Sequence, residues 1–494
     1  MKKKVIIIGG GIAGLSAGIY SAKCGFEVTV LESHNLAGGN CTSWKRNGYL
    51  FEGGMHWLTG SNKNEDLHKM WRYVGALDDS VPIYTPEPFL EYDHQGTPIR
   101  LYRDVDTTQK YLTELAGADE KEIKGLCNNI RKVQKLAMPV TDIQGVKVTK
   151  KNRLSLSLLF SVIPAFLILR KFRKISQEAY ISRFSHEGIR DLLRSCTDSK
   201  TGVVPLFFTM GILARGDGGF PAGGSLPFVE RIVKTFISLG GELCLSTRAE
   251  QVVIENNQAV GVMVNGNMLA ADAVIITSDT MSMDSLFVTP PNAPWLAEMR
   301  ATTEPTMATF ISLGLNADLS KYQKGFIFKL NQPIILGSQT YEYLNANNYA
   351  SDPTYSPPGK TALTIILSGD TYDFWKKAKN EGRYAEEKEK ISAEVIKALA
   401  EYLPETKDTV EVTDIATPLT YERYCGNWKG SWMTEMTPSM KMQTYPAVIQ
   451  GLGGLYFAGQ RMLPPGGLPG ALMSGRTAVQ YLCRDTNTVF ISEG

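Results

Sequence analysis

The fold class is decided by a stretch close to the start of the chain, Val5-Ile6-Ile7-Ile8-Gly9-Gly10-Gly11-Ile12-Ala13-Gly14. Its opening apolar run is typical of a strand that is buried on both faces of a parallel sheet. The pattern G-x-G-x-x-G follows at once, and apolar residues then recur at helical spacing. A second apolar strand occupies residues 28–31 and ends at Glu32. This succession of strand, glycine turn, helix, strand and acid predicts a dinucleotide-binding unit.

Each residue type in this unit has a physical role. Gly9 permits a tight turn, Gly11 lets the backbone approach a pyrophosphate, and Gly14 lets the helix pack on the strand. The amino terminus of the helix, around Ala13, offers unpaired N–H groups to the diphosphate. Glu32 stands 18 positions after Gly14, where a carboxylate can accept hydrogen bonds from a ribose diol. We therefore expect these residues to contact the nucleotide.

Further motifs, most of them rich in glycine, are spread along the whole chain. They are Ala37-Gly38-Gly39-Asn40, Gly53-Gly54-Met55-His56, Gly219-Phe220-Pro221-Ala222-Gly223-Gly224, Thr417-Pro418-Leu419-Thr420-Tyr421-Glu422-Arg423-Tyr424, Gly454-Leu455-Tyr456-Phe457-Ala458-Gly459-Gln460 and Pro465-Gly466-Gly467-Leu468-Pro469-Gly470-Ala471. On these motifs the sequence resembles FAD enzymes of the glutathione-reductase-like fold, and among them the phytoene desaturase, carotenoid isomerase and retinol saturase family. Asn40 stands where many members carry a basic residue, and a polar residue there is more similar to the retinol saturase and carotenoid isomerase branches.

The resemblance implies an α/β architecture: a glutathione-reductase-like FAD-binding Rossmann fold with a discontinuous second α+β substrate domain. We expect the FAD-binding domain at residues 1–75, 215–285 and 448–494. The substrate- and membrane-facing domain is then formed by residues 76–214 and 286–447.

Local patterns predict several elements within this frame. A helix with apolar residues from Leu226 to Ile237 precedes a small β-meander, with strands expected at 242–245, 251–255 and 259–264 and a further strand at 271–276. An amphipathic helix is expected at 386–403, stopped by Pro404. Near the end of the chain, a strand at 455–458 precedes a helix from Leu472 onward, whose amino terminus would stabilise negative charge on a reduced flavin.

The resemblance also implies how FAD is held. Gly459 would contact the pyrophosphate–ribityl region, Gly470-Ala471-Leu472 the flavin ring, and the Val252 backbone the adenine end. The expected FAD contacts are Gly9, Gly11, Ala13, Gly14, Glu32, Gly38, Gly39, Asn40, Gly54, Met55, His56, Val252, Gly459, Gln460, Gly470, Ala471 and Leu472.

The chemistry implied is a redox reaction of a polyene or other isoprenoid lipid, by hydride transfer at the flavin. Desaturation, saturation and isomerisation all remain open. Saturation needs a proton donor, for which His56 is the candidate and a packed or backbone-bonded histidine is the alternative interpretation. Tyr421 and Arg423 are further catalytic candidates that are equally compatible with a structural role. Because the sequence contains no second strand–G-x-G-x-x-G–helix unit, we expect electrons to pass to or from a quinone, oxygen or a reducing partner.

Two other function classes share this fold. A flavin amine oxidase would release peroxide from amines and usually lacks the basic segment described next. A non-enzymatic lipid escort protein, similar to the escort factors of prenylated proteins, would not retain flavin, and the intact glycine set argues against it.

Residues 147–174 combine positive charge with apolar character. They contain eight Lys or Arg (Lys147, Lys150, Lys151, Arg153, Arg170, Lys171, Arg173 and Lys174) and no Asp or Glu. Between these charges, residues 154–169 are mostly apolar and too short to span a bilayer, for which roughly 20 residues are needed. We expect a peripheral attachment to an anionic membrane surface, which would give a lipid substrate direct access. A buried helix with solvated basic ends is the alternative.

The overall composition excludes several other classes. With 52 Lys plus Arg against 50 Asp plus Glu, the chain has no basic excess for nucleic acid. Its 7 cysteines include no C-x-x-C pair and its histidines number 5, so neither a disulfide framework nor a metal site is expected. No apolar stretch reaches the 18 residues that indicate a transmembrane helix, so no such helix is expected. These features favour a cytoplasmic protein at the membrane periphery.

Overall fold

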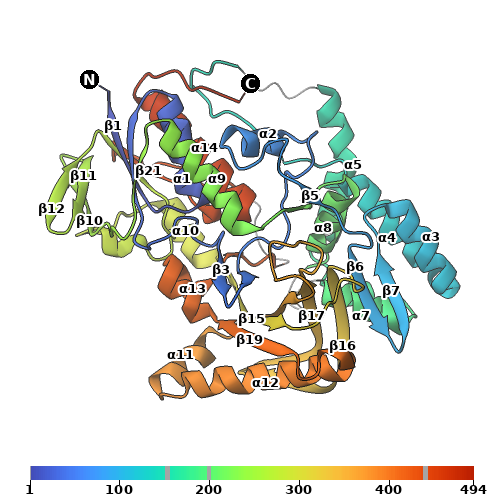
Figure 1. Ribbon diagram of the computed structural model, residues 1–494. Helices are drawn as coiled ribbons and strands as arrows, with labels where there is room; N and C mark the ends of the chain where they lie inside the picture. Colours follow the sequence, from blue (N-terminus) through green and yellow to red (C-terminus); the bar gives the residue numbers. More distant parts are fainter. Residues whose placement is uncertain (1, 139, 151–155, 197–201, 438–442, 494) are drawn as a thin grey trace.

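The computed structural model describes residues 2–138, 140–150, 156–196, 202–437 and 443–493. Figure 1 shows a parallel sheet with its helices at the upper left, a second sheet below, and a group of helices at the right.

Five strands form the parallel sheet, in the order β21-β13-β1-β2-β9. Their bounds are β1 Lys4–Ile8, β2 Glu27–Leu31, β9 Glu242–Cys244, β13 Ala273–Ile276 and β21 Leu455–Phe457. Val5 and Ile7 of β1 pack into the core under the helices α1 (Ile12–Lys23), α9 (Ser225–Ser238) and α14 (Gly467–Asp485). Ile6 and Ile8 pack into the core on the opposite face. Burial on both faces explains why β1 is an unbroken apolar run, and the predicted strand–helix–strand unit is confirmed.

A three-stranded antiparallel meander covers that opposite face, with β10 (Gln251–Glu255), β11 (Gln258–Val264) and β12 (Asn267–Ala270). The expectation that residues 242–245 belong to the meander is wrong, because β9 pairs in parallel with β2. The third meander strand is β12, which the sequence did not reveal. All of its residues are exposed, so it carries no alternation of buried and polar positions.

The start of α14 also differs from the prediction. The helix begins at Gly467 rather than at Leu472. The first turn was not predicted because it contains Pro469 and Gly470, which are uncommon inside helices. Proline is tolerated in a first turn, since the first N–H groups of a helix have no partner within it.

Seven strands form the second sheet, in the order β19-β15-β18-β17-β16-β6-β7. Their bounds are β6 Leu90–His94, β7 Thr97–Leu101, β15 Ala308–Leu315, β16 Gly325–Leu336, β17 Gln339–Asn348, β18 Thr361–Ser368 and β19 Val410–Ala416. Only the β16–β6 pairing is parallel within it. One face packs against α11 (Tyr372–Asn380) and α12 (Tyr384–Tyr402), and α12 confirms the amphipathic helix predicted at 386–403.

Helices form a third region beside this sheet. They are α3 (Val105–Leu115), α4 (Glu120–Val133), α5 (Leu156–Phe172), α6 (Gln177–Ile181), α7 (Glu187–Ser195) and α8 (Val204–Ala214), and they share one core. The predicted basic residues Lys151 and Arg153 lie outside the described residues. In the described part of the chain, no helix is both long and apolar enough to cross a bilayer.

Short elements join these regions. They are β3 (Ser43–Arg46), β4 (Tyr49–Glu52), α2 (Asp66–Tyr73), β5 (Ile83–Tyr84), β8 (Phe220–Pro221), α10 (Pro294–Thr302), β14 (Pro305–Thr306), α13 (Pro418–Cys425) and β20 (Met433–Thr434), with 3₁₀ turns at Gly117–Asp119, Met283–Leu286, Pro404–Thr406, Trp428–Gly430 and Gln460–Met462.

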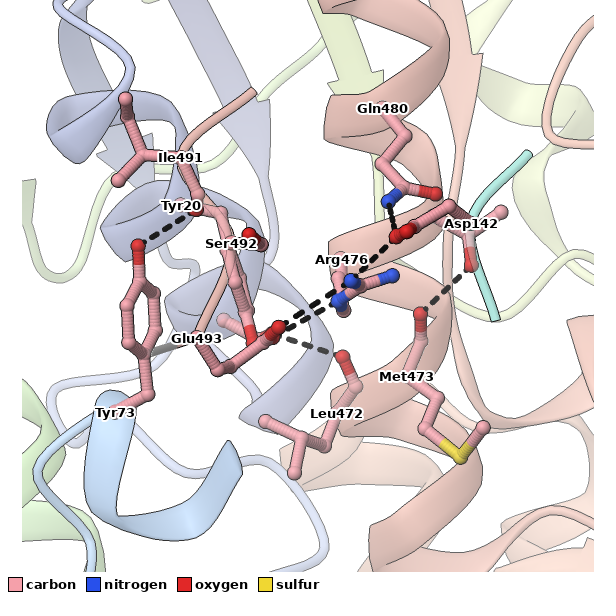
Figure 2. A network of polar contacts seen from close by, with 12 residues as sticks. Tyr20, Tyr73, Asp142, Leu472, Met473, Arg476, Gln480, Ile491, Ser492 and Glu493 are labelled. Carbon is pink, nitrogen blue, oxygen red and sulfur yellow. Dashed lines mark hydrogen bonds and ion pairs between the residues drawn. The ribbon is translucent and has the colours of Figure 1, made fainter. Parts of the chain in front are cut away.

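A buried arginine ties the carboxyl-terminal tail to α14 (Figure 2). Arg476 Nε donates to Glu493 Oε1 at 2.8 Å, and Nη2 donates to Asp142 Oδ1 at 2.7 Å. Tyr73 donates its hydroxyl to the Ile491 carbonyl at 2.7 Å. Two carboxylates around one guanidinium offset the cost of burying its charge. The network therefore fixes α14 against segments that are distant in the sequence.

Candidate active site

A cavity of about 490 Å³ lies at the carboxyl ends of the parallel strands. Its walls include residues at or just beyond the ends of β1, β2, β13 and β21. Across from them stand Phe310 of β15, Ile366 of β18, Tyr421 of α13 and Trp432. We call this cavity the groove. Its position is the one at which open α/β sheets bind their ligands.

The glycine turn after β1 is built as the sequence predicted. Gly9 has a φ of +109°, and a Cβ on Gly14 would lie 1.9 Å from the Gly9 carbonyl oxygen. At Gly11 a Cβ would come no closer than 3.8 Å to the protein atoms around it. Gly11 also lines the groove, so the space that its missing side chain leaves is available to a ligand.

Glu32 is buried at the end of β2 and presents its carboxylate to the groove. Gly10 N donates to Oε2 at 2.7 Å, and His34 N donates to Oε1 at 2.8 Å. Each oxygen keeps lone-pair capacity for a hydroxyl donor, as the predicted contact with a ribose requires.

The double glycines form the next part of the wall. Gly38 has a φ of +121° and donates its N–H to the Gly10 carbonyl at 2.9 Å. A Cβ on Gly54 would lie 2.1 Å from the Asn40 carbonyl oxygen. The buried carboxylate of Glu52 accepts the N–H groups of Gly54 and Met55, both at 2.9 Å. These contacts hold two loops from different parts of the chain against each other.

Most predicted contacts line the groove: Gly9, Gly11, Ala13, Glu32, Gly38, Gly39, Asn40, Gly54, His56, Gly459, Gln460 and Ala471, together with Tyr421 and Arg423. The structure does not bring Gly14, Met55, Val252, Gly470 and Leu472 into this wall. Val252 and Leu472 are core residues of the meander and α14, and Gly14 packs on Gly9. Gly470 packs close to the Gln460 and Leu463 carbonyls, and Met55 lines a separate cavity.

A buried ion pair in the groove wall was missed from the sequence. Arg461 Nε donates to Asp279 Oδ1 at 2.8 Å, and Nη2 donates to Ser431. Arg461 Nη1 and Ser278 Oγ are buried without a hydrogen-bond partner in the described structure, and both residues line the groove. A charge within the apolar stretch around residues 455–462 was the only local signal for Arg461.

Aromatic side chains gather where the groove meets the second sheet. The His56 ring stacks on Phe310 with centroids 5.5 Å apart, and Phe310 also contacts Tyr421 and Trp432. Burial, helped by the positive charge of Lys324, lowers the pKa of His56 to about 3. His56 is therefore a neutral imidazole at physiological pH.

The other two catalytic candidates differ in their surroundings. Tyr421 is buried and donates its hydroxyl to the Gly53 carbonyl at 2.7 Å, and burial raises its pKa well above the usual value. The hydroxyl proton of Tyr421 is thus engaged in the hydrogen bond to the Gly53 carbonyl. Arg423 is exposed at the rim, with its guanidinium over the Tyr424 ring.

Comparison with known protein families identifies the family of this chain. The model of the family described as "Flavin containing amine oxidoreductase" matches residues 12–483. The chain belongs to this family. Its cofactor is accordingly FAD, and it is a flavin-dependent oxidoreductase.

Several similar proteins have names that refer to polyenes. All-trans-retinol 13,14-reductase of Danio rerio is 22% identical, with 95% of this chain and 85% of that protein covered. Prolycopene isomerase of Daucus carota is 22% identical, with 97% and 80% covered. The lycopene-forming phytoene desaturase of Pseudescherichia vulneris is also 22% identical, with 98% and 99% covered. The resemblance inferred from the sequence is thereby confirmed at the level of the family.

Solved structures confirm the fold. A putrescine oxidase variant gives a TM-score of 0.63 at 15% identity, with 98% of this chain and 99% of that one covered. An oxidoreductase from Methanosarcina mazei gives 0.60 at 16% identity, with 97% and 100% covered. The chain thus has the predicted α/β FAD-binding fold.

The residues present fit FAD. The space beside Gly11 leaves room for a diphosphate at the amino terminus of α1, and Glu32 faces the groove. The unpartnered Nη1 of Arg461 and Oγ of Ser278 supply donors that a polar cofactor group can accept. These features make the groove suited to a dinucleotide along its length.

Proposed function

We propose that the enzyme acts on carbon–carbon bonds of a hydrophobic polyene or isoprenoid lipid, by desaturation, saturation or isomerisation. The observation that carries this proposal is the composition of the groove at its aromatic end. Phe310, Ile366 and Trp432 form apolar walls there, while His56 is neutral and the Tyr421 hydroxyl is already bonded. Such walls favour an uncharged, elongated substrate. The names of the polyene-acting relatives support the same substrate class.

The flavin supplies hydride exchange when it is bound. The protein's own residues orient the lipid and exclude water. We propose that Phe310 and Trp432 hold the polyene by their ring faces. His56 is stacked on Phe310 and lines the groove, and its lowered pKa argues against delivery of a proton from an imidazolium. Tyr421 keeps the Gly53 turn in place through its hydroxyl.

The test is product analysis under controlled redox conditions. Purified holoenzyme is incubated anaerobically, in its oxidised and its reduced form, with all-trans-retinol, phytoene and prolycopene in detergent micelles. Chromatography and mass spectrometry then distinguish a loss of two hydrogens, a gain of two, and an unchanged mass with altered double-bond geometry. Failure of all three lipids to react in either form would contradict the proposal.

A flavin amine oxidase is the alternative, because putrescine oxidase shares the fold. It predicts peroxide release from putrescine or benzylamine in air. Asp279, an acid in the groove wall between the two ends, is already paired with Arg461. A cationic amine would therefore compete with an existing salt bridge.

We further propose that α5 attaches the enzyme to an anionic membrane. Ile163, Phe166 and Leu167 are 47%, 58% and 60% exposed. Arg170 and Lys171 are exposed one turn further along, so an apolar patch and basic charges share one helix face. Each basic residue near an anionic surface contributes about 1 kcal/mol. On this basis we propose that the enzyme is a cytoplasmic protein at the periphery of a membrane.

Flotation with liposomes tests this attachment. F166S/L167S and R170Q/K171Q should each reduce binding to phosphatidylserine vesicles, the second pair more at low salt than at high salt. K390Q/K397Q, on the exposed face of α12, is the matched control and should bind as the wild type does. Equal flotation of all variants would contradict the attachment.

We also propose the predicted two-domain division, with boundaries at residues 75, 214, 285 and 447. It is supported by the strands, since the parallel sheet and the meander fall within the FAD-binding ranges and the second sheet falls within the others. Residues 141–150 belong instead beside α14 and the carboxyl-terminal tail, to which they are hydrogen-bonded.

A further inference from the structure

A second cavity adjoins the aromatic end of the groove. It has a volume of about 250 Å³ and is lined by Met55, Phe220, Lys324, Tyr349 and Asp352, among others. We call it the lysine cavity. Met55 lines it, whereas the next residue, His56, lines the groove. The Tyr349 hydroxyl, on its side, lies 3.5 Å from His56 Nδ1. The two cavities therefore meet at His56.

Lys324 is the distinctive group of the lysine cavity. Its Nζ is buried and has no hydrogen-bond partner among the described residues. It lies 3.3 Å from the ring centroid of Tyr349 and 4.9 Å from that of Phe220. The aromatic faces attract a cation but accept none of its N–H groups in a conventional hydrogen bond. A buried donor without an acceptor is unfavourable, so an acceptor brought by a ligand would remove this cost.

The surrounding charges limit what that ligand can be. Glu52 and Asp352 both act electrostatically on Lys324, and both carboxylates already accept hydrogen bonds, from Ser225 and Gly223 among others. Burial lowers the pKa of Lys324 to about 7. Near neutral pH the cavity therefore has no excess positive charge that would favour an anionic group. A neutral oxygen acceptor suits it better than a carboxylate does.

We propose that the lysine cavity binds the oxygen-bearing end of an elongated unsaturated lipid, whose carbonyl or hydroxyl oxygen accepts a hydrogen bond from Lys324 Nζ. This inference rests on the proposed function, because the remainder of the lipid lies in the groove. Lys324 then determines specificity: it selects oxygenated polyenes over hydrocarbons. A hydrocarbon would fill the apolar walls but leave the buried amine unpaired.

The first test is a binding measurement on the holoenzyme. The probes are all-trans-retinol and the hydrocarbon with the same skeleton but no hydroxyl, and quenching of protein fluorescence gives both dissociation constants. The wild type should prefer retinol by about tenfold, the effect of one hydrogen bond to a buried donor. K324M should lose this preference and keep its affinity for the hydrocarbon. K329M changes an exposed lysine of β16 and should retain the preference. A K324M enzyme with the wild-type preference would overturn the inference.

The second test needs neither turnover nor a stable variant. All-trans-retinal condenses with a neutral lysine amine to give an imine and water; sodium cyanoborohydride then adds hydride to the imine carbon and water supplies the proton to nitrogen, leaving a secondary amine. At pH 7, peptide mass spectrometry should find this adduct at Lys324 ahead of Lys329, and excess retinol should suppress it. Adducts only at exposed lysines would overturn the inference.

The two proposals fail in different ways. Specific labelling of Lys324 by retinal, with no polyene reacting at the flavin, would contradict the proposed function and leave the binding site standing. Turnover of polyenes with no selectivity for oxygenated ones, unchanged in K324M, would contradict only the lysine cavity.

Discussion

The two ends of the groove are built from different parts of the chain. At the FAD end the wall is mainly backbone. It consists of the glycine turn that follows β1 and the glycine turn that follows Glu32, and amide hydrogen bonds hold them in place. At the aromatic end the wall consists of side chains from β15, β18 and α13. A backbone wall depends on the absence of side chains, whereas a side-chain wall depends on which residues meet. The first should tolerate almost no substitution, and the second should tolerate changes of size better than changes of charge.

The largest effect should come from adding one methyl group at the FAD end. In G14A the new Cβ would lie 1.9 Å from the Gly9 carbonyl oxygen, which forces the glycine turn away from α1. We expect the purified protein to lose its flavin, measured as the ratio of visible to ultraviolet absorbance. The control is G125A in α4, where a Cβ meets no atom within 4 Å. A G14A protein with full flavin content would contradict the backbone account.

The next largest effect should come from the ion pair between the two ends. D279N leaves the Arg461 guanidinium, 2% exposed, without its counter-charge. Removing one partner of a buried pair costs about 3–5 kcal/mol, and urea unfolding of the holoenzyme measures it. D284N breaks the partly exposed pair with Arg300 and should cost less than about 1 kcal/mol. A similar loss of unfolding free energy in the two variants would show that solvent screens the Asp279–Arg461 pair as well as it screens the exposed pair.

A smaller effect at the aromatic end should depend on pH. Burial lowers the pKa of His56 to about 3, below the unfolded value of about 6.5. As the pH falls below about 6.5, the unfolded chain gains a proton at this site and the folded protein does not, so His56 reduces stability progressively. The slope is at most about 1.4 kcal/mol per pH unit. H56Q should therefore lose less stability than the wild type between pH 7 and pH 5, measured by urea unfolding at each pH. Parallel losses would contradict a buried neutral imidazole.

The smallest effect should come from the contact that joins the two ends. Y421F removes the hydroxyl that donates to the Gly53 carbonyl at 2.7 Å, at a cost of about 1 kcal/mol in unfolding free energy. Flavin should remain bound. Y424F, at an exposed neighbour, should be neutral. Complete loss of flavin in Y421F would mean that the two ends are less independent than the structure indicates.

The same contrast explains what the sequence could predict. The FAD end is visible locally, because residues 5–32 contain its strand, turn, helix and acid in consecutive order. Asp279 and Arg461 are separated by 182 positions, and no local pattern marks their contact. No local pattern marks Lys324 either, because one lysine before a strand is ordinarily a surface residue.

Errors in the predicted elements have similar causes. β9 and the strands of the meander look alike locally, and only pairing with β2 assigns β9 to the parallel sheet. Residues 267–270 form a strand with no buried side. His56 lines the groove, but its charge state depends on burial and on Lys324, which a linear sequence does not display.

The most direct measurement is the visible absorbance of the holoenzyme in a single anaerobic turnover with a polyene. For a desaturase, the oxidised flavin bands near 450 nm should bleach on mixing with phytoene; for a saturase, the bands of the dithionite-reduced enzyme should return on mixing with all-trans-retinol. An isomerase should convert prolycopene only when the flavin is bound. If the spectrum is unchanged with all three lipids, no lipid is isomerised and putrescine alone bleaches the flavin, the polyene account is contradicted and the enzyme is an amine oxidase.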